Sequence, residues 1–385
     1  MRPFFSAAIA ASLFISVPAI ASQVILNASN AGWYDNSGFH DSNPNDLAGS
    51  CSAATCGTAM QFRNFSVFDL SAVSGTVVAA EFRPYEPAVS DGLGNGYASV
   101  DPTETYTTFD VSTPPGTVIA GGTGLTAIFA DLGTGTSYGA VTTSNADNGS
   151  FLTVALNRAA VAAINGALGG SFAIGGSVTS ILGGGDQLIF GFTGATPNQL
   201  VLTISDCASG PVDVSHCLIA TSGKLQISDS ETAGKDKLSW QWGKGEAFAQ
   251  ADVGAPDVAT TYKLCVFDQT AGVSSVKAEL DIAASATTWV SKAPKGVQYK
   301  DKEGTSDGVT KAQIKTGADG KTQVKISAAT ANLTLPVPLD ATKYFDQDAS
   351  VIVQLVGSTG TCWTSSFGVA DTTTNVGDAF KAQVK

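Results

Sequence analysis

Short apolar runs separated by turn residues extend through most of this chain, and they restrict the folds that it can adopt. Examples are FRNFSVFDL at residues 62–70, TYKLCVFD at 261–268 and SVIVQLVG at 350–357. Runs of this length, rich in Val, Ile, Phe and Tyr, are typical of β-strands. Residues 156–170 differ, because Ala, Val, Ile and Leu recur there at helical spacing before a Gly-Gly pair. The pattern predicts an all-β fold with one short helix in its N-terminal half.

The clearest local pattern is a hairpin at residues 310–327, TKAQIKTGADGKTQVKIS. Two alternating runs flank an Asp-Gly dipeptide, which is favoured in tight turns between strands. The alternation predicts that Ile314, Val324 and Ile326 point inward and that the lysines of the hairpin face solvent. Those lysines are Lys311, Lys315, Lys321 and Lys325.

Basic residues divide the chain into two parts. Residues 22–206 contain no lysine and only three arginines against 14 acidic residues, a formal charge of −11. Residues 207–385 contain 17 lysines against 19 acidic residues, a charge of −2. The change falls at CASGPVDVSHC, residues 207–217, where Gly, Pro and Ser mark a turn-rich passage. We therefore predict two β-sandwich domains, 22–206 and 218–385, joined by a linker at 207–217.

The first 21 residues are typical of an export signal. Arg2 precedes an apolar stretch, and Ala19-Ile20-Ala21 offers small residues at the positions that a signal peptidase recognises. We expect cleavage after Ala21, no transmembrane segment in the mature chain, and a secreted, extracellular or cell-surface location. The net charge of −12 argues against nucleic-acid binding.

Export permits disulfides, and the chain has six cysteines. Sequence alone allows fifteen complete pairings. Neighbourhood favours Cys51 with Cys56, Cys207 with Cys217, and Cys265 with Cys362. A zinc site is the alternative, but the Cys-x4-Cys pair has no second pair at a finger-like distance.

Residues 23–206 resemble a family of secreted bacterial surface proteins. The stretch FRNFSVFDLSAVSGTVVAAEFRPY, residues 62–85, is similar to the signature of DNRLRE-type domains, and residues 101–113 and 190–203 also fit proteins that carry a PEP-CTERM sorting tail. The resemblance implies a jelly-roll-like sandwich without assigned catalysis. The last residues, GDAFKAQVK, do not match the sorting tail, so we do not expect membrane anchoring through it.

Residues 218–385 resemble a lysine-rich β domain of exported proteins whose function is unknown. The matching pieces are residues 224–230, 296–326 and 353–363. We expect an Ig-like sandwich for this domain.

A polar loop, GWYDNSGFHDSNPND at residues 32–46, is a candidate calcium site. Its candidate ligands are Asp35, Asp41, Asn43, Asn45 and Asp46. An EF-hand is excluded, because the sixth position of such a loop would be Asp46 instead of Gly and the twelfth would be Ser52 instead of Glu. A looser oxygen cage is the hypothesis, and hydrogen-bonded Asx turns around Pro44, which need no ion, are the favoured alternative.

Aromatic side chains near predicted loops form a second candidate site. Trp33, Tyr34, Tyr85 and Tyr97 all fall at loops or strand ends, and such rings suit the C–H faces of sugars. Core packing is an equally good interpretation for them. For Trp240 and Trp242, which share a face with Leu238, core packing is favoured.

Patterns that would indicate catalysis are weak. GTSYG at residues 135–139 has the spacing of a hydrolase elbow, but a polar turn-forming stretch follows where that motif requires a helix. Glu104 and Asp110 would lie about 20 Å apart along one strand, too far for a glycosidase pair. We expect no enzymatic activity and no cofactor, with structural calcium as the alternative.

These observations favour an exported, non-catalytic protein of a cell surface or extracellular matrix that acts by assembly or adhesion. Its partners would be surface or matrix polymers, including glycans. A glycan-binding module is the alternative, and a hydrolase is a distant third.

Overall fold

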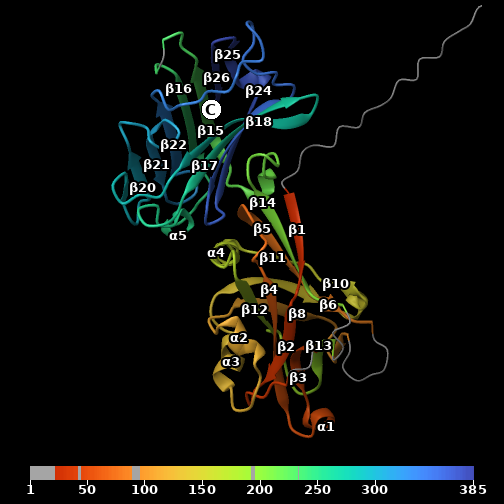
Figure 1. The fold of residues 1–385 in the computed structure, drawn as a ribbon. Coiled ribbons are helices and arrows are strands. Elements are labelled where there is room, and N and C mark those ends of the chain that lie inside the picture. The colour runs from red at the N-terminus through yellow and green to blue at the C-terminus, as the bar shows by residue number, and fades with distance from the viewer. Residues whose placement is uncertain (1–21, 42–44, 89–95, 192–195, 233) are drawn as a thin grey trace, which may run out of the picture.

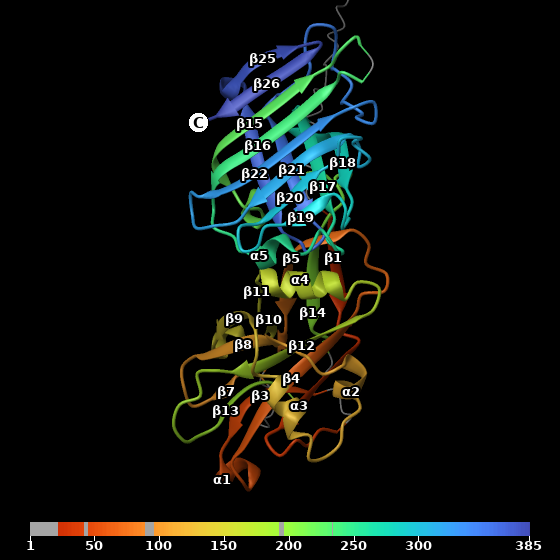
Figure 2. The same ribbon diagram turned by 90° about the vertical axis from the view of Figure 1, so that its left-hand side faces the viewer.

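The computed structural model describes residues 22–41, 45–88, 96–191, 196–232 and 234–385. The predicted signal peptide, residues 1–21, lies outside the described residues. The chain forms two β-sandwiches stacked end to end, as Figures 1 and 2 show from two sides. This confirms the prediction of an all-β fold with two sandwiches.

The first sandwich is built from strands β1 to β14. One sheet has the order β1-β14-β5-β11, the other has the order β7-β13-β3-β4-β12-β8-β9 with β2 also paired to β4, and β6 pairs with β10. The strands are β1 (Ser22–Asn27), β2 (Asn30–Asp35), β3 (Asp46–Cys51), β4 (Met60–Asp69), β5 (Thr76–Arg83), β6 (Tyr85–Glu86), β7 (Ala98–Ser99), β8 (Glu104–Asp110), β9 (Ser137–Thr143), β10 (Ser150–Phe151), β11 (Val154–Leu156), β12 (Ser171–Val178), β13 (Gln187–Gly191) and β14 (Gln199–Ser205). All of these pairings are antiparallel.

The helix predicted within residues 156–170 is confirmed as α4 (Arg158–Gly166). The Asn157 side chain caps it by accepting a hydrogen bond from the backbone N–H of Ala160 at 3.2 Å. Three shorter helices of this domain escaped the sequence analysis: α1 (Ala53–Cys56), α2 (Pro115–Ile119) and α3 (Thr126–Asp131). Each has six residues or fewer, too few to show a helical period.

The second sandwich is built from strands β15 to β26. An eight-stranded sheet has the order β19-β20-β21-β22-β16-β15-β26-β25 and packs on a four-stranded sheet, β18-β17-β23-β24. The strands are β15 (Ala220–Ser228), β16 (Lys237–Gly245), β17 (Tyr262–Thr270), β18 (Val273–Ile282), β19 (Trp289–Ser291), β20 (Val297–Lys300), β21 (Val309–Lys315), β22 (Thr322–Ala329), β23 (Ser350–Gly357), β24 (Cys362–Gly368), β25 (Thr372–Val376) and β26 (Ala379–Val384). One helix, α5 (Gln250–Val253), and three 3₁₀ turns, at Asn145–Asp147, Val214–His216 and Val369–Asp371, complete the described elements.

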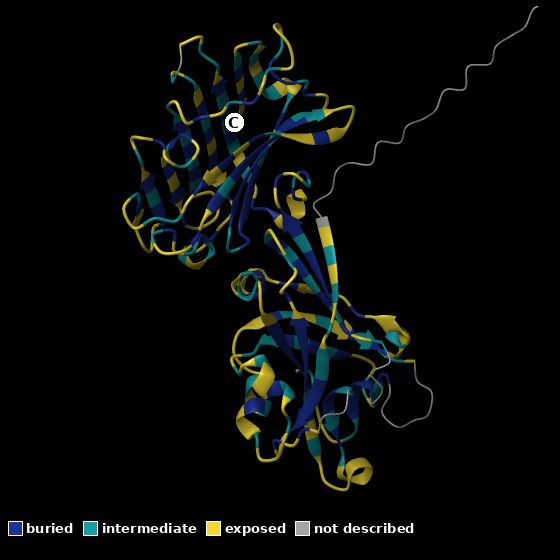
Figure 3. Ribbon diagram, viewed as in Figure 1, coloured by how far each residue is buried: buried dark blue, intermediate teal, exposed yellow. Residues whose placement is uncertain are grey.

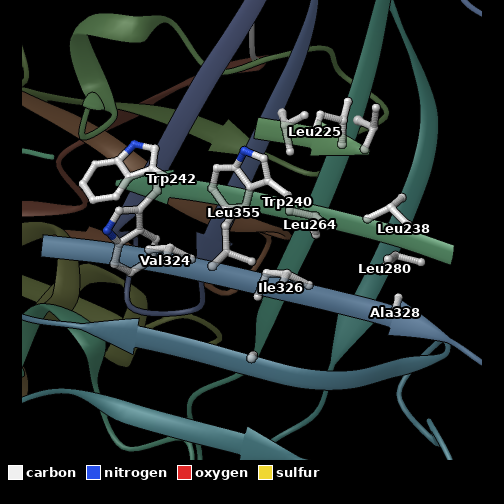
Figure 4. Packing of buried hydrophobic residues seen from close by; sticks show 14 of the residues in the cluster. Leu225, Leu238, Trp240, Trp242, Leu264, Leu280, Val324, Ile326, Ala328 and Leu355 are labelled. Atoms are coloured by element: carbon white, nitrogen blue, oxygen red, sulfur yellow. The ribbon is translucent and has the colours of Figure 1, made fainter. Parts of the chain in front are cut away.

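The core of the second sandwich confirms two sequence predictions. Trp240 and Trp242 are fully buried and point with Leu238 between the two sheets, next to Leu264 and Leu355 (Figure 4). The predicted hairpin is β21 and β22, with its three apolar residues buried and its lysines at the surface. Strict alternation made both sets of side chains predictable, because it assigns each residue of a strand to a face.

All six cysteines form disulfides, but two of the three predicted pairings are wrong. Cys51 pairs with Cys56 as expected, whereas Cys207 pairs with Cys265 and Cys217 with Cys362. The linker lies along the outer face of the four-stranded sheet, so its first end meets β17 and its second end meets β24. The prediction paired cysteines by their closeness in the sequence, which does not reflect their closeness in the fold.

Candidate functional site

The polar loop of residues 32–46 is held by its own hydrogen bonds at Asp35. The Asp35 carboxylate accepts from the Ser37 N–H at 2.8 Å, the Ser37 hydroxyl at 2.6 Å and the Phe39 N–H at 3.0 Å. This is the Asx-turn arrangement that needs no ion. Asp35 is buried, and these three donors point at its Oδ1.

Asp46, the other end of the predicted calcium site, has different partners. Its carboxylate accepts from the side-chain amides of Asn64 at 2.6 Å and Asn198 at 2.5 Å. Both donors are N–H groups, and their partly positive hydrogens would repel a cation bound to the same oxygens. Asn43 lies outside the described residues, and in the described part of the chain no three His, Cys, Asp or Glu side chains form a metal site. We therefore assign Asp35 and Asp46 to hydrogen bonding, and the hypothesis for Asp41 and Asn45 stays a prediction.

Asp46, itself half-buried, is the centre of a network of buried polar side chains that ties the two sheets of the first sandwich together. Tyr106 donates its hydroxyl to Asn64, and Asn198 donates to the Ser66 hydroxyl at 2.9 Å while accepting from a backbone N–H. Burial raises the pKa of Asp46 to about 6, against the opposing effect of its two amide donors. Each buried polar group gains a partner here, as a low-dielectric interior requires.

Glu86 is another acid of this sandwich, and it is fully buried. One carboxyl oxygen accepts from the Phe190 N–H at 2.7 Å, and the other has no hydrogen-bond partner among the described residues. Burial, with a smaller contribution from the charges of Asp46 and Asp147, raises the pKa of Glu86 to about 8, against the opposing effect of the Phe190 hydrogen bond. The carboxyl is therefore mainly protonated at neutral pH. It is fully enclosed, so it contributes to the core and not to chemistry on an external substrate.

The candidate sugar-binding aromatics do not form an exposed platform. Trp33, Tyr34 and Tyr97 are 8, 0 and 7% exposed. Trp33 and Tyr34 belong to β2, where sequence reasoning expected a loop. Tyr85 alone is half-buried, and its ring packs edge-on against Phe151 with 5.2 Å between centroids. A stacking site needs open ring faces, and the three buried rings do not offer them.

Each buried ring has a structural role. Trp33 packs edge-on against Phe62 at 5.2 Å between centroids. The Tyr34 ring packs at a tilt against His40, with 4.7 Å between centroids, and its hydroxyl donates to the Val118 carbonyl at 2.8 Å. These contacts join β2 to β4, to His40 and to α2, and they account for the burial of both rings.

The residues of the weak catalytic patterns also lie apart from one another. Ser137 begins strand β9 and is followed by strand, not by a helix. Glu104 accepts from the hydroxyls of Ser99 and Ser180, and Asp110 at the other end of β8 accepts from a backbone N–H. These hydrogen bonds give the acids structural roles at strand ends.

The most distinctive feature built by the fold is the junction of the two sandwiches. Residues 207–217, the strap, run across the outer face of the four-stranded sheet between the two disulfides. Midway, the buried Gln354 side chain bonds to both backbone groups of Val212. Its Oε1 accepts from the Val212 N–H at 2.8 Å, and its Nε2 donates to the Val212 carbonyl at 2.7 Å. The strap is thus held at both ends and at its centre.

The first sandwich docks onto the strapped end of the second. Val78 of β5 packs with Val212, Val356 and the Cys217–Cys362 disulfide in one buried cluster. The backbones approach so closely that a methyl group on Gly360 would lie 2.5 Å from the Val77 carbonyl oxygen. The junction is therefore a packed contact between the two domains.

Two open cavities flank the strap. One, of about 580 Å³, lies on the second sandwich and is lined by Pro211, Val214, Ile219, Ile352 and Ser366 among others. The second, of about 600 Å³, lies between the sandwiches. The lining of the first is mainly apolar, with hydroxyl and amide groups and the acidic residue Asp213. Sequence reasoning missed both, and the only signal for them was the pair of cysteines that bounds the strap.

Comparisons with known proteins do not identify a family. No protein-family model and no curated protein matches the chain. A solved structure to which the chain is similar is described as "putative beta-galactosidase from bacteroides fragilis", with 9% sequence identity and a TM-score of 0.20. The match covers 91% of this chain and 41% of that one. Likeness at this level says nothing about activity.

Proposed function

We propose that this chain is an exported, non-catalytic component of a cell surface or extracellular matrix, acting by assembly or adhesion. The observation that carries the proposal is the strapped junction, which joins two sandwiches into one elongated unit. A chain that bridges partners benefits from such stiffness, because less conformational freedom is lost on binding. Neither domain needs a catalytic group for this role.

Other observations support an extracellular setting. Three disulfides and no free cysteine suit an oxidising compartment. Among the described residues, no helix has the length and apolar character to span a bilayer. The acid-rich first domain, with a charge of −11, favours solubility and repels other acidic surfaces.

The proposal is tested with the mature chain, residues 22–385, incubated with purified cell-wall and matrix polymers. We expect co-sedimentation with a polymer or concentration-dependent self-assembly, with the polymer left intact. Release of sugar or peptide fragments would overturn the non-catalytic assignment. Chains with the disulfides reduced serve as a control, because loosening the strap is expected to weaken retention.

A further inference from the structure

Among the described residues, no strand pairs with β1 on the side away from β14, so this edge of the first sandwich is open. It pairs with β14 along all six residues without a register shift, and Ile25 is 56% exposed. Val24 and Leu26 pack on the core, whereas Gln23, Ile25 and Asn27 face solvent. β1 forms the outer border of its sheet in Figure 1, and Figure 3 shows its exposed and intermediate residues. An open, regular edge of this kind is a template for another strand.

Most other sheet edges of the described chain are obstructed. The edge strands β7, β11 and β19 have only two or three residues. The edge strands β9, β18 and β25 each pair with their one neighbouring strand through a register shift. Strand β18 also carries the charged residues Lys277, Glu279 and Asp281. The edge of β24 is occupied by Leu218, which exchanges backbone hydrogen bonds with it. Irregularity, charge and shortness are the usual protections of edges, and β1 has none of them.

One hydrogen bond shows which backbone groups of β1 are open. The N–H of Ala28 donates to the Asn198 carbonyl on the β14 side at 2.8 Å, and the next N–H, of Ser29, turns to β4. Because these directions alternate along a strand, the N–H and C=O groups of Gln23, Ile25 and Asn27 point away from β14. Three residues therefore present donors and acceptors to the free edge.

Charge identifies the partner that fits this edge. β1 and β14 contain no charged residue, although the domain that carries them has a charge of −11. A second copy would be repelled by most of this domain, but not by the uncharged band. The strand is also complementary to itself: an antiparallel copy centred on Ile25 places Gln23 opposite Asn27, whose amides pair, and Ile25 opposite itself. Only this register uses all three open residues of both strands.

We propose that two copies of this chain associate through antiparallel pairing of β1 with β1, about a two-fold axis at Ile25. The pairing continues the sheet β11-β5-β14-β1 into the partner copy and gives an isologous interface. It deepens the proposed function and rests on it, because it names the partner used in assembly.

The test compares charged variants at the axis by sedimentation equilibrium, over about a hundredfold range of protein concentration. Wild-type chain is expected to show a monomer–dimer equilibrium. Ile25→Lys and Ile25→Glu are each expected to weaken association by about tenfold or more, because like charges then lie opposite each other. An equimolar mixture of the two variants is expected to restore dimers, which only residue 25 opposite residue 25 explains.

Val258→Lys is the matched control, since Val258 is 77% exposed and lies in the second domain. It should leave association unchanged, and melting temperatures should show that all variants fold. A wild-type chain that stays monomeric at every concentration, or a dimer indifferent to both charges at position 25, would overturn the β1 pairing. Polymer retention by such a monomer would leave the proposed function standing, so the two failures are distinguishable.

Discussion

Gln354 and Val212, 142 residues apart in sequence, exchange two hydrogen bonds between a buried side-chain amide and the backbone of the strap. The amide thereby replaces the neighbouring strand that Val212 lacks. Because the strap crosses the outer face of a sheet, its backbone would otherwise be buried without partners.

Removing this amide should destabilise the protein. Gln354→Leu leaves the Val212 N–H and C=O unsatisfied, and each such group costs about 1–3 kcal/mol. We expect a loss of roughly 2–6 kcal/mol in the free energy of unfolding, measured by denaturant titration. Gln383→Leu, at an exposed site on β26, is the control and should change stability by about 0.5 kcal/mol or less. Equal effects of the two substitutions would contradict the role of Gln354.

The disulfide pattern predicts a defined peptide map. Non-reducing digestion should yield Cys207 linked to Cys265 and Cys217 linked to Cys362. Replacing both Cys217 and Cys362 with Ala should cost about 5 kcal/mol, because the bridge closes a loop of 145 residues. Recovery of a Cys207–Cys217 peptide would disprove this arrangement.

Stability should fall as pH rises, through Glu86. Its folded pKa of about 8 lies above the usual 4.5, so the stabilisation is fully present below pH 4.5 and is lost as pH rises through 8. Each unit of that interval corresponds to about 1.4 kcal/mol. Glu86→Gln replaces the titratable carboxyl group with a carboxamide that stays neutral. It should therefore flatten the decline in stability between pH 6 and 8. Thermal melts across this range measure it, and an unchanged slope in the variant would refute the assignment.

Gly360 should be intolerant of a side chain because of the domain junction. A methyl group there would lie 2.3 Å from a Val161 methyl and 2.5 Å from the Val77 carbonyl oxygen. Gly360→Ala should therefore lower stability by more than Gly57→Ala, whose site also has a positive φ but has no atom within 4 Å. We expect about 1 kcal/mol for Gly57→Ala and roughly 3 kcal/mol for Gly360→Ala. Small-angle scattering should show undocking only in the Gly360 variant.

Calcium should not affect stability through the loop of residues 32–46. Asp35 and Asp46 already accept hydrogen bonds from neighbouring donors, so the melting temperature is expected to stay constant over about a hundredfold range of free calcium. A rise in melting temperature that disappears in Asp41→Ala would instead establish an ion at this loop.

The alternating patterns were enough to predict the strands and the faces of their side chains. Ile314, Val324 and Ile326 are buried as expected, since each residue of a strand faces one side or the other by geometry alone. Trp240 and Trp242 followed from the same rule. The helix over 158–166 was predictable because nine residues suffice to show a helical period.

The candidate sites could not be predicted in this way. Trp33 and Tyr34 looked like loop aromatics because Gly32 and Asp35 flank them, yet β2 pairs with β4 and buries both rings. Asp46 looked like a ligand, but Asn198, 152 residues away, donates to it. Partners so distant in sequence leave no local pattern.

The sequence by itself determined the strand periodicity, the contrast in basic residues between the two halves, and the presence of six cysteines in a chain with an export-like start. Only the tertiary structure decided which cysteines pair, which acids are buried and which strand is left at an edge. The reason is physical: alternation acts between neighbours along the chain, whereas disulfides, buried acids and sheet edges depend on the order in which strands far apart in sequence come to lie side by side.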